Sequence, residues 1–205
     1  MNLLFFLLMS CTLIGVVEMF KRRFSLPTNV SRRVTHIGAS LIAAASPLFL
    51  NQLTIVIACL FFAGLIFFGR KTTLLSSIHD VERRSFGDVF LPLGEAVSAI
   101  VFLPHSIAAF QFGILVMGIS DAFAGLGGEK FGKHKIHFFG NHKSIEGSII
   151  FFICTLILAL LFAPVFSHQV IIVSAILTIV EFLAIYGFDN LVLPTLGAFL
   201  ILSFI

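Results

Sequence analysis

Long apolar segments alternate along the chain with short clusters of polar and charged residues. The apolar segments cover about residues 2–20, 35–50, 52–69, 89–104, 107–127, 147–166, 170–187 and 191–205. A helix needs roughly 17–25 mostly apolar residues to cross the hydrocarbon core of a bilayer, and several of these segments are near the short limit. The pattern therefore predicts eight transmembrane helices, or seven if one segment is re-entrant.

The composition agrees with a membrane protein built as one domain. Of the 205 residues, 59% are hydrophobic and 11% are charged, a balance that is foreign to soluble domains. The first segment has no basic residue before its apolar run and no small-residue cleavage pattern, so we expect a span and not a signal peptide. Cys11, Cys59 and Cys154 lie within apolar segments and are expected to be buried packing residues. We predict an all-α, polytopic integral membrane protein with one transmembrane domain over residues 1–205.

The basic residues predict which ends of the helices face the cytoplasm. In an eight-helix alternation all 13 Lys and Arg fall on one side, in three loops: Lys21, Arg22, Arg23, Arg32 and Arg33; Arg70, Lys71, Arg83 and Arg84; Lys130, Lys133, Lys135 and Lys143. By the positive-inside rule this side is cytoplasmic and both termini face outward. The opposite connections, near residues 51–52, 104–105 and 166–169, carry no Lys, Arg, Asp or Glu. We expect contact with anionic lipid head groups, and no nucleic-acid partner.

Carboxylates gather at the same end of the predicted helices. They are Glu18, Glu95, Asp121, Glu146, Glu181 and Asp189. A carboxylate within a membrane is costly and usually faces a polar interior or marks a site. For Glu18, neutralisation by a neighbouring basic residue is an equally good explanation, but six carboxylates on one face favour a functional site there.

The segment from residue 121 to 147 departs from the apolar pattern. Asp121 is followed at i+3, i+4 and i+7 by Ala124, Gly125 and Gly128, which form a stripe of small residues on one helical face. Close helix packing is one explanation of such a stripe. Gly127–Gly128 are expected to end the helix, and Ser144 is expected to be the N-cap of the next one, with Glu146 in its first turn.

Lysines, glycines and a helix N-terminus together suit a polyphosphate, because they supply charge and close N–H donors without bulk. Neighbouring carboxylates suit Mg²⁺, which takes one or two acidic ligands besides phosphate oxygens and water. The segment contains neither a Walker A sequence nor the kinase GxGxxG pattern. It therefore predicts a Mg-nucleotide site at the membrane surface on chemical grounds.

The motifs resemble those of the polyprenol kinase family, multi-span enzymes that use CTP or another nucleotide to phosphorylate a lipid alcohol. The resemblance runs, in order, through residues 32–38 (RRVTHIG), 86–94 (FGDVFLPLG), the pattern DxxAxxxGxxxGK from Asp121, KSxEG from Lys143, and Glu181 followed by DNLVLP at 189–194. The early element departs from the family pattern, since Gly38 stands only two residues after His36. The matches cover about residues 32 to 194.

The resemblance implies a membrane-embedded catalytic domain that binds Mg²⁺ or Mn²⁺, CTP as phosphoryl donor, and an isoprenoid alcohol of the phytol, geranylgeraniol or polyprenol type. It assigns the metal to Asp121 and Glu146. The expected nucleotide-binding residues are Gly128, Lys130, Gly132, Lys133, Lys143, Ser144 and Gly147. Further site candidates are Arg32, Arg33, Glu181, Asp189 and Asn190. Asp121, Glu95 and His36 remain alternatives for a general base, and the reaction hardly needs one.

Other interpretations stay open. Part of the pattern is also similar to phosphatidate cytidylyltransferases, but their basic C-terminal signature is excluded because no Lys or Arg follows Lys143. A CTP-dependent diacylglycerol kinase remains possible within the same group. An ion-coupled transporter would place its acids near the bilayer midplane in related halves, which this chain lacks. Asp189–Asn190 either cap the last helix, with Asn190 as N-cap, or complete the site, and His134, His137 and His142 are expected in a solvated loop. The sequence leaves the oligomeric state open.

Overall fold

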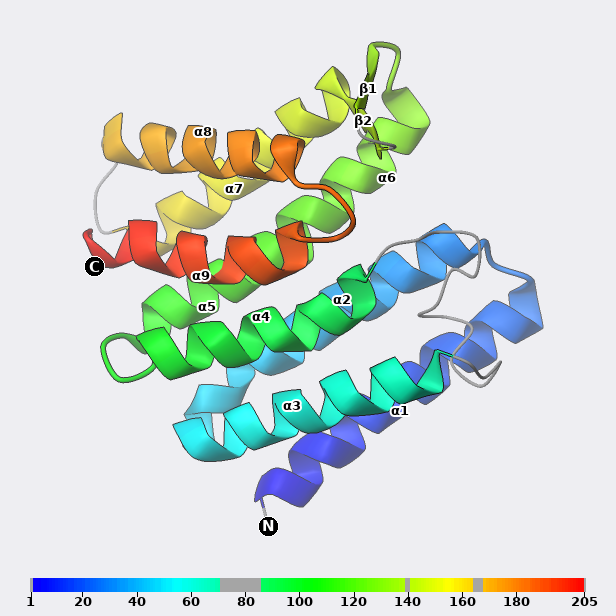
Figure 1. Cartoon of the computed structure of the whole chain (residues 1–205), viewed down its shortest axis with the longest axis vertical. Coiled ribbons are helices and arrows are strands. Elements are labelled where there is room, and N and C mark those ends of the chain that lie inside the picture. Colours follow the sequence, from blue (N-terminus) through cyan, green and yellow to red (C-terminus); the bar gives the residue numbers. More distant parts are fainter. Residues whose placement is uncertain (1, 71–85, 139–140, 164–167, 205) are drawn as a thin grey trace.

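A computed structural model of the chain describes residues 2–70, 86–138, 141–163 and 168–204. The described residues form nine α-helices and one β-hairpin (Figure 1). The helices are α1 (Asn2–Phe24), α2 (Thr28–Ala45), α3 (Gln52–Gly69), α4 (Gly87–Phe102), α5 (Ile107–Leu115), α6 (Asp121–Phe131), α7 (Ile145–Phe162), α8 (His168–Leu183) and α9 (Asp189–Leu202). The all-α prediction is confirmed. Lys71, Arg83, Arg84 and residues 166–167, which the predicted topology uses, lie outside the described residues.

Each of the eight apolar segments contains at least part of a described helix, and the segment 107–127 contains α5 and most of α6. Val116–Ser120 form a π-helical turn that joins these two helices into one rod. Four helices are long and apolar enough to cross a membrane: Leu3–Phe24, Gln52–Gly69, Ile107–Phe131 and Ile145–Phe162. The apolar helices α8 and α9 have 16 and 14 residues, below that length.

Two boundaries differ from the sequence-based expectation. Helix α2 begins at Thr28 and not near residue 35, because the polar residues before the apolar segment continue the helix toward the site. Helix α6 continues to Phe131 and does not end at Gly127–Gly128, since its glycines pack closely against the neighbouring helix α7. The prediction of buried cysteines holds for Cys59 but is wrong for Cys11, which is exposed on the surface of α1.

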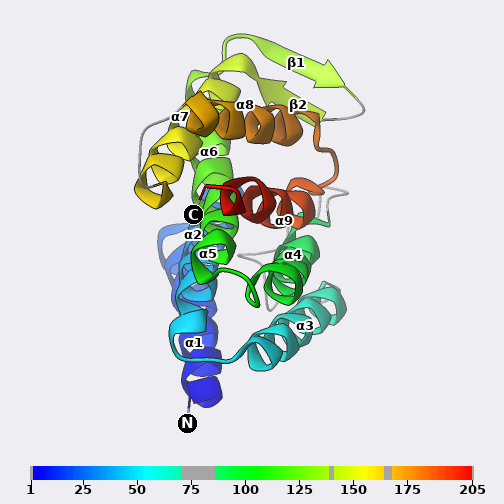
Figure 2. The same ribbon diagram turned by 90° about the vertical axis from the view of Figure 1, so that its left-hand side faces the viewer.

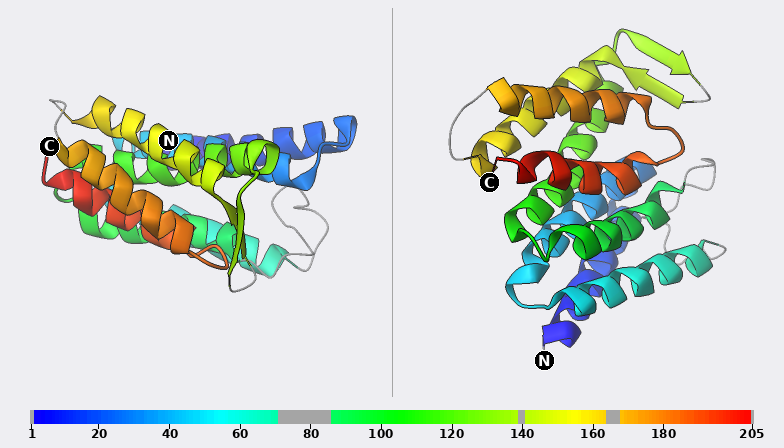
Figure 3. Two further views of the ribbon diagram at one scale, coloured as in Figure 1. Left: turned by 90° about the horizontal axis from the view of Figure 1, so that it is seen from above. Right: turned by 60° about the vertical axis from the view of Figure 1, so that its left-hand side comes forward.

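The helices are arranged in two layers, with α5 and α6 acting as one rod (Figure 2). One layer contains α8, α9, α4 and α3 in spatial order, and the other contains α7, the α5–α6 rod, α2 and α1. Figure 3 shows the same arrangement from two further directions. The layers meet where α5 packs on α9 and α7 packs on α8. Helices α1 and α3 are therefore the edge helices of the two layers.

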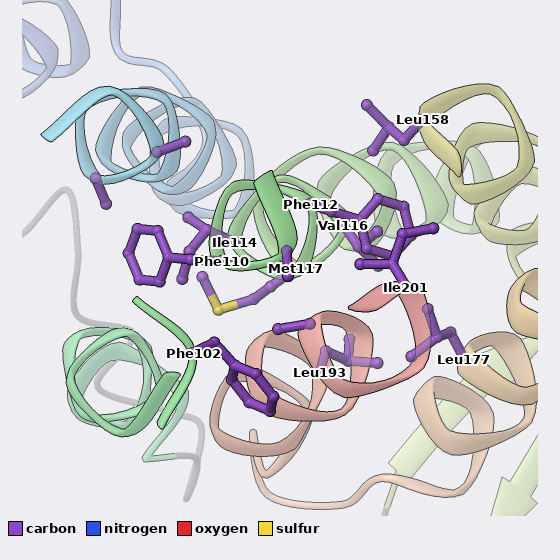
Figure 4. Packing of buried hydrophobic residues seen from close by; sticks show 14 of the residues in the cluster. Phe102, Phe110, Phe112, Ile114, Val116, Met117, Leu158, Leu177, Leu193 and Ile201 are labelled. Carbon is purple, nitrogen blue, oxygen red and sulfur yellow. The ribbon is translucent and has the colours of Figure 1, made fainter. Parts of the chain in front are cut away.

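The apolar core fills the space between the layers around α5 and α9. Phe112, Ile114 and Met117 of the central rod are fully buried in this core, and Figure 4 shows Phe112 beside Ile201 of α9. In a lipid environment the driving force for such packing is close van der Waals contact, because lipid tails are as apolar as the side chains. The core thus holds α5 and α9 in a fixed position beside the region where the layers separate.

Small residues allow the backbones of α4, α5 and α9 to approach one another. A Cβ atom at Gly113 would lie 2.0 Å from the carbonyl oxygen of Pro194, and one at Gly94 would lie 2.1 Å from that of Asn190. Pro194 has no N–H, so the Asn190 carbonyl lacks its ordinary intrahelical donor and faces α4 instead. Glycine at these two positions fixes where α9 begins relative to α4, which positions Asp189 at the site.

The connections fall at two opposite ends of the helices (Figure 1). The α1–α2 turn, the α8–α9 loop and the hairpin lie at one end, and the α2–α3 and α4–α5 connections lie at the other. The hairpin pairs β1 (Lys135–Phe138) with β2 (Asn141–Ser144) in antiparallel register, with Lys135 opposite Ser144 and Ile136 opposite Lys143. The basic residues that the structure describes therefore gather at the hairpin end, as the sequence pattern predicted.

Candidate active site

A cavity of about 960 Å³ lies between the two layers, where α1, α2 and α6 face α3, α4 and α9. Charged residues form the part of the cavity near the hairpin: Arg32, Arg33, Asp121, Lys135, Lys143, Glu181 and Asp189. Apolar residues form the part farther from the hairpin: Phe6, Leu13, Ile14, Ala39, Ala43 and Phe62. This volume is at the upper end of the roughly 300–1,000 Å³ of pockets that enclose a small ligand. The cavity is thus large enough for a ligand with one charged and one apolar part.

Asp121 opens α6 directly after the π-helical turn and lines the cavity. Single-turn π segments within α-helices are frequent at functional sites. Ala124, Gly125 and Gly128 line the same cavity, so the predicted stripe of small residues faces it. The packing explanation is also supported, since a Cβ at Gly125 would lie 1.7 Å from Nη1 of Arg33. The stripe lets a charged side chain of α2 lie against the backbone of α6.

Lys143 connects the hairpin to the last two helices. Its ammonium group donates to the carboxylate of Glu181, donates to the Glu181 carbonyl oxygen at 2.9 Å, and lies 3.8 Å from Oδ2 of Asp189. Asp121 is within electrostatic range of all three residues. Burial disfavours the charge, but Glu181, Asp189 and Asp121 more than offset this, so the pKa of Lys143 is raised above its ordinary value. Lys143 therefore stays protonated at neutral pH.

Helix α2 contributes two arginines and a histidine to the site. Arg33 Nη2 donates to Glu129 of α6 at 2.6 Å, and Asn29 Nδ2 donates to the other oxygen of Glu129 at 2.6 Å. Arg32 lines the cavity within electrostatic range of Asp189. His36 lines it one turn farther along, and its buried Nε2 has no hydrogen-bond partner. A buried nitrogen without a partner is costly unless a ligand completes it.

Glu95 of α4 faces the apolar part of the cavity and is 6% exposed. Cys59 Sγ lies 3.7 Å from its Oε2, and its Oε1 has no hydrogen-bond partner. Nearer the hairpin, Arg70 pairs with Asp88 at 3.3 Å and lies over the ring of Phe86 at 4.4 Å. Helix α4 thus supplies a paired acid near the charged part and, near the apolar part, an acid with one buried oxygen that lacks a hydrogen-bond partner.

The hairpin end of α7 matches the sequence-based expectation. Ser144 is the N-cap of α7, and its Oγ accepts from the N–H of Gly147 at 3.0 Å. Both residues line the cavity beside Gly128. Glu146 lies in the first turn as predicted, but its carboxylate accepts from the His134 N–H at 3.2 Å and pairs with His134 Nδ1 at 2.8 Å. Among the described residues that line the cavity, Glu146 is absent.

Three other candidates also lie apart from the cavity. Lys130 and Lys133 are exposed, and Lys130 Nζ lies 5.3 Å from the ring of Phe131. Gly132 packs against Ser144, where a Cβ would lie 2.9 Å from the Ser144 Cβ. These residues are not among those that line the cavity in the described part of the chain. Their role in nucleotide binding stays a prediction.

Asn190 is not the N-cap of the last helix, which corrects that alternative. It is the second residue of α9, and its Nδ2 donates to the carbonyl oxygen of Gly87 at 2.7 Å. This bond joins α9 to the start of α4, a contact over more than a hundred positions that sequence spacing cannot indicate. Asn190 and Asp189 both line the cavity, which favours the alternative that they complete the site.

Sequence reasoning did not single out Glu129, counted Lys135 only among the loop lysines and expected His137 in a solvated loop, whereas all three line the cavity. Glu129 stands at i+8 from Asp121, so the helical period that identified the small-residue stripe could have included it. Lys135 and His137 alternate on strand β1, which places both on one face of the hairpin. Four-residue strands with charged residues carry too little pattern to be recognised as strands.

The comparisons with known proteins agree on a family. Residues 1–192 match the model of the cytidylyltransferase family. The chain is 30% identical to the phytol kinase of Synechocystis over 206 aligned positions, which cover 94% of this chain and 88% of that protein. It is 36% identical to an uncharacterized protein of Methanocaldococcus jannaschii over 117 positions, which cover 56% and 57% of the two chains. No solved structure matches.

Proposed function

The chain belongs to the cytidylyltransferase family, in the group of polyprenol and phytol kinases that its motifs resemble, and on that premise we propose that it is a lipid-alcohol kinase. The proposed reaction transfers the γ-phosphoryl group of CTP to the hydroxyl of an isoprenoid alcohol of the phytol or geranylgeraniol type. The observation that carries the proposal is the cavity, because it joins a cluster of charged residues to an apolar part, called the chamber below. The transferred phosphoryl group needs charged surroundings and the lipid tail needs apolar ones, and the new bond forms where the two meet.

The triphosphate would bind in the charged part of the cavity. Lys143, Arg32 and Lys135 supply positive charge there from three different elements. The N-terminal turn of α7, capped by Ser144, lies beside them with the positive end of its helix dipole toward the cavity. Phosphoryl transfer depends mainly on positioning and on charge neutralisation, and these groups provide both.

The acids of the site fit a Mg²⁺ or Mn²⁺ ion that shares its coordination with phosphate oxygens. Among the described residues no group of three or more His, Cys, Asp and Glu is arranged to hold a metal by itself. Asp121 and Asp189 are close enough to interact electrostatically and both line the cavity, and Mg²⁺ typically uses one or two carboxylates with phosphate and water. When bound, the ion would neutralise charge on the transferred group. Asp189 is a better second ligand than Glu146, which pairs with His134.

We assign His36 as the general base that accepts the proton of the substrate hydroxyl. It lies between the charged cluster and the apolar chamber, and its buried Nε2 lacks a partner. The hydroxyl oxygen attacks the γ-phosphorus, the bond to the β-phosphate oxygen breaks, and the nucleoside diphosphate leaves. The hydroxyl proton passes to Nε2 and then to water. Glu95, which lines the cavity and whose buried Oε1 has no hydrogen-bond partner, would orient the alcohol.

A label-transfer assay on the purified protein in detergent tests this function. CTP labelled at the γ-phosphate and CTP labelled at the α-phosphate are supplied separately with Mg²⁺ and a panel of prenols, diacylglycerol and phosphatidic acid. We expect γ-label in a prenol and no label in the lipid from the α-position. The Asp121→Asn variant, compared at equal folded amount, is expected to lose the transfer.

Each other result identifies a different function. γ-Label in diacylglycerol would make the protein a diacylglycerol kinase. α-Label in phosphatidic acid would identify a cytidylyltransferase, the activity after which the matching family model is named. If no label is transferred from CTP, nor from ATP supplied in its place, the result would contradict the proposed enzymatic function and favour the ion-coupled transporter.

A further inference from the structure

The apolar part of the cavity forms a chamber between the edge helices of the two layers. The residues that line it are Leu13 and Ile14 of α1, Ala39 and Ala43 of α2, and Phe62 of α3. Ala39 and Ala43 are four positions apart, so they lie on one face of α2 and leave room beside that face. The chamber is continuous with the charged part of the cavity, and His36 and Glu95 stand where the two parts meet.

The chamber is closed at the end farthest from the hairpin. Phe6 of α1 is 4% exposed and packs in one buried cluster with Ala58 and Phe62 of α3. Phe49 and Leu50 pack against the same cluster and are not among the described residues that line the cavity. Two aromatic rings from different layers therefore form its end wall.

Because a prenol is already dissolved in the bilayer, moving its tail into the protein adds little hydrophobic free energy. Discrimination between tails must then come from shape, through the space that the chamber offers and the wall that ends it. The whole cavity measures about 960 Å³, and part of it is needed for a triphosphate. The space that remains suits a short prenyl tail and excludes a long polyprenol.

We propose that this chamber binds the tail of the lipid alcohol and that Phe6 and Phe62 set the longest tail accepted. This inference rests on the proposed kinase function and adds the residues that limit the length of the substrate tail. With the tail in this chamber, the hydroxyl would lie at His36, which lines the same cavity.

Two opposite substitutions test the chamber by turnover. Phe62→Ala removes part of the end wall, and we expect kcat/KM for a longer prenol to rise about tenfold relative to geranylgeraniol. Ala39→Leu fills the chamber, and we expect activity on geranylgeraniol to fall about tenfold while activity on geraniol persists. Phe68→Ala on α3 is the matched control, because that side chain is 79% exposed and does not line the cavity.

A second readout does not depend on turnover. A geranylgeraniol that carries a diazirine at the far end of its tail is photolysed with the protein, and peptides containing Phe6 or Phe62 are expected to carry the adduct. If Phe62→Ala and Ala39→Leu both leave the dependence of turnover on prenol length unchanged and the adducts lie elsewhere, the chamber is not the tail-binding site. The proposed kinase function would still stand. Adducts at Phe6 or Phe62 without any turnover would support the chamber and overturn the proposed function.

Discussion

At the scale of single residues, Lys143 makes the contacts that most directly connect the site to the fold. We predict that Lys143→Ala lowers kcat/KM about 10²–10³-fold, since a preorganised positive charge at the phosphates is lost. The variant also leaves Glu181 buried without its partner, which destabilises by about 3–5 kcal/mol. The double variant Lys143→Met with Glu181→Gln removes that unpaired charge, so its activity, measured on folded protein, isolates the role of the ammonium group.

The same activity measurement distinguishes phosphate binding by the cavity residues from phosphate binding by the lysines of the family motif. If the triphosphate binds inside the cavity, Lys130→Ala and Lys133→Ala retain most of the activity, as does Arg23→Ala on the exposed end of α1. A loss in Lys133→Ala as large as in Lys143→Ala would favour the assignment from the family motif. Near-normal turnover of Lys143→Ala would contradict the cavity as the phosphate site.

His36 carries a second prediction at this scale. We expect His36→Asn to lower kcat about 10²-fold, the lower end of general base catalysis, with little change in KM for CTP, because the side chain faces the hydroxyl and not the phosphates. The neighbouring Val34→Ala, at a 47% exposed position, serves as the control. An equal fall in affinity for CTP would instead place His36 at the nucleotide.

Local signals in the sequence predicted part of this site. Ser144 as N-cap and the stripe from Asp121 to Gly128 follow from spacing along one helix, and both are confirmed. The partners of Glu146 and Asn190 did not follow, because His134 and Gly87 come close to them only through the hairpin and the packing of α4 on α9. Residue type and period reveal a helix face, whereas the partner of that face depends on tertiary contacts.

At the scale of helices, α5 and α9 depend on backbone contact at Gly113. We predict that Gly113→Val destabilises the protein by about 1–3 kcal/mol, because the added side chain would meet the Pro194 carbonyl. Gly64→Val is the matched control, as a Cβ at Gly64 meets nothing within 4 Å. Thermal denaturation of both variants in the same detergent measures the difference, and equal midpoints would show that α5 and α9 separate without cost.

The helices themselves were largely predictable, because apolar runs near the thickness of a bilayer leave few alternatives to a helix. The start of α2 at Thr28 was missed, since polar residues that project toward a site do not continue the apolar run. The hairpin was missed because β1 (KIHF) alternates polar and apolar residues over only four positions and β2 (NHKS) has no apolar residue. Both misses lie at the site, where function and apolar patterning conflict.

At the scale of the whole molecule, the two-layer arrangement could not be read from the sequence, and the number of spans remains a prediction of eight or seven. The described helices show four that are long and apolar enough to span, while α8 and α9 are shorter. Short helices can cross a bilayer that thins locally around them. The separation of basic connections from uncharged ones at opposite ends of the layers supports the alternation that the loops predicted.

Sidedness is the last prediction, and it concerns the bilayer around the whole chain. With Cys11, Cys59 and Cys154 replaced by Ala, single cysteines are introduced as Ser25→Cys in the α1–α2 turn and His105→Cys in the α4–α5 connection, both exposed positions. By the positive-inside rule, an impermeant maleimide is expected to label the first only in inside-out vesicles and the second only in right-side-out vesicles. External CTP should then support prenol phosphorylation only in inside-out vesicles, because the charged part of the cavity lies at the Ser25 end. Labelling of both cysteines from one side would contradict the eight-helix alternation, and activity with external CTP in right-side-out vesicles would place the site on the opposite face.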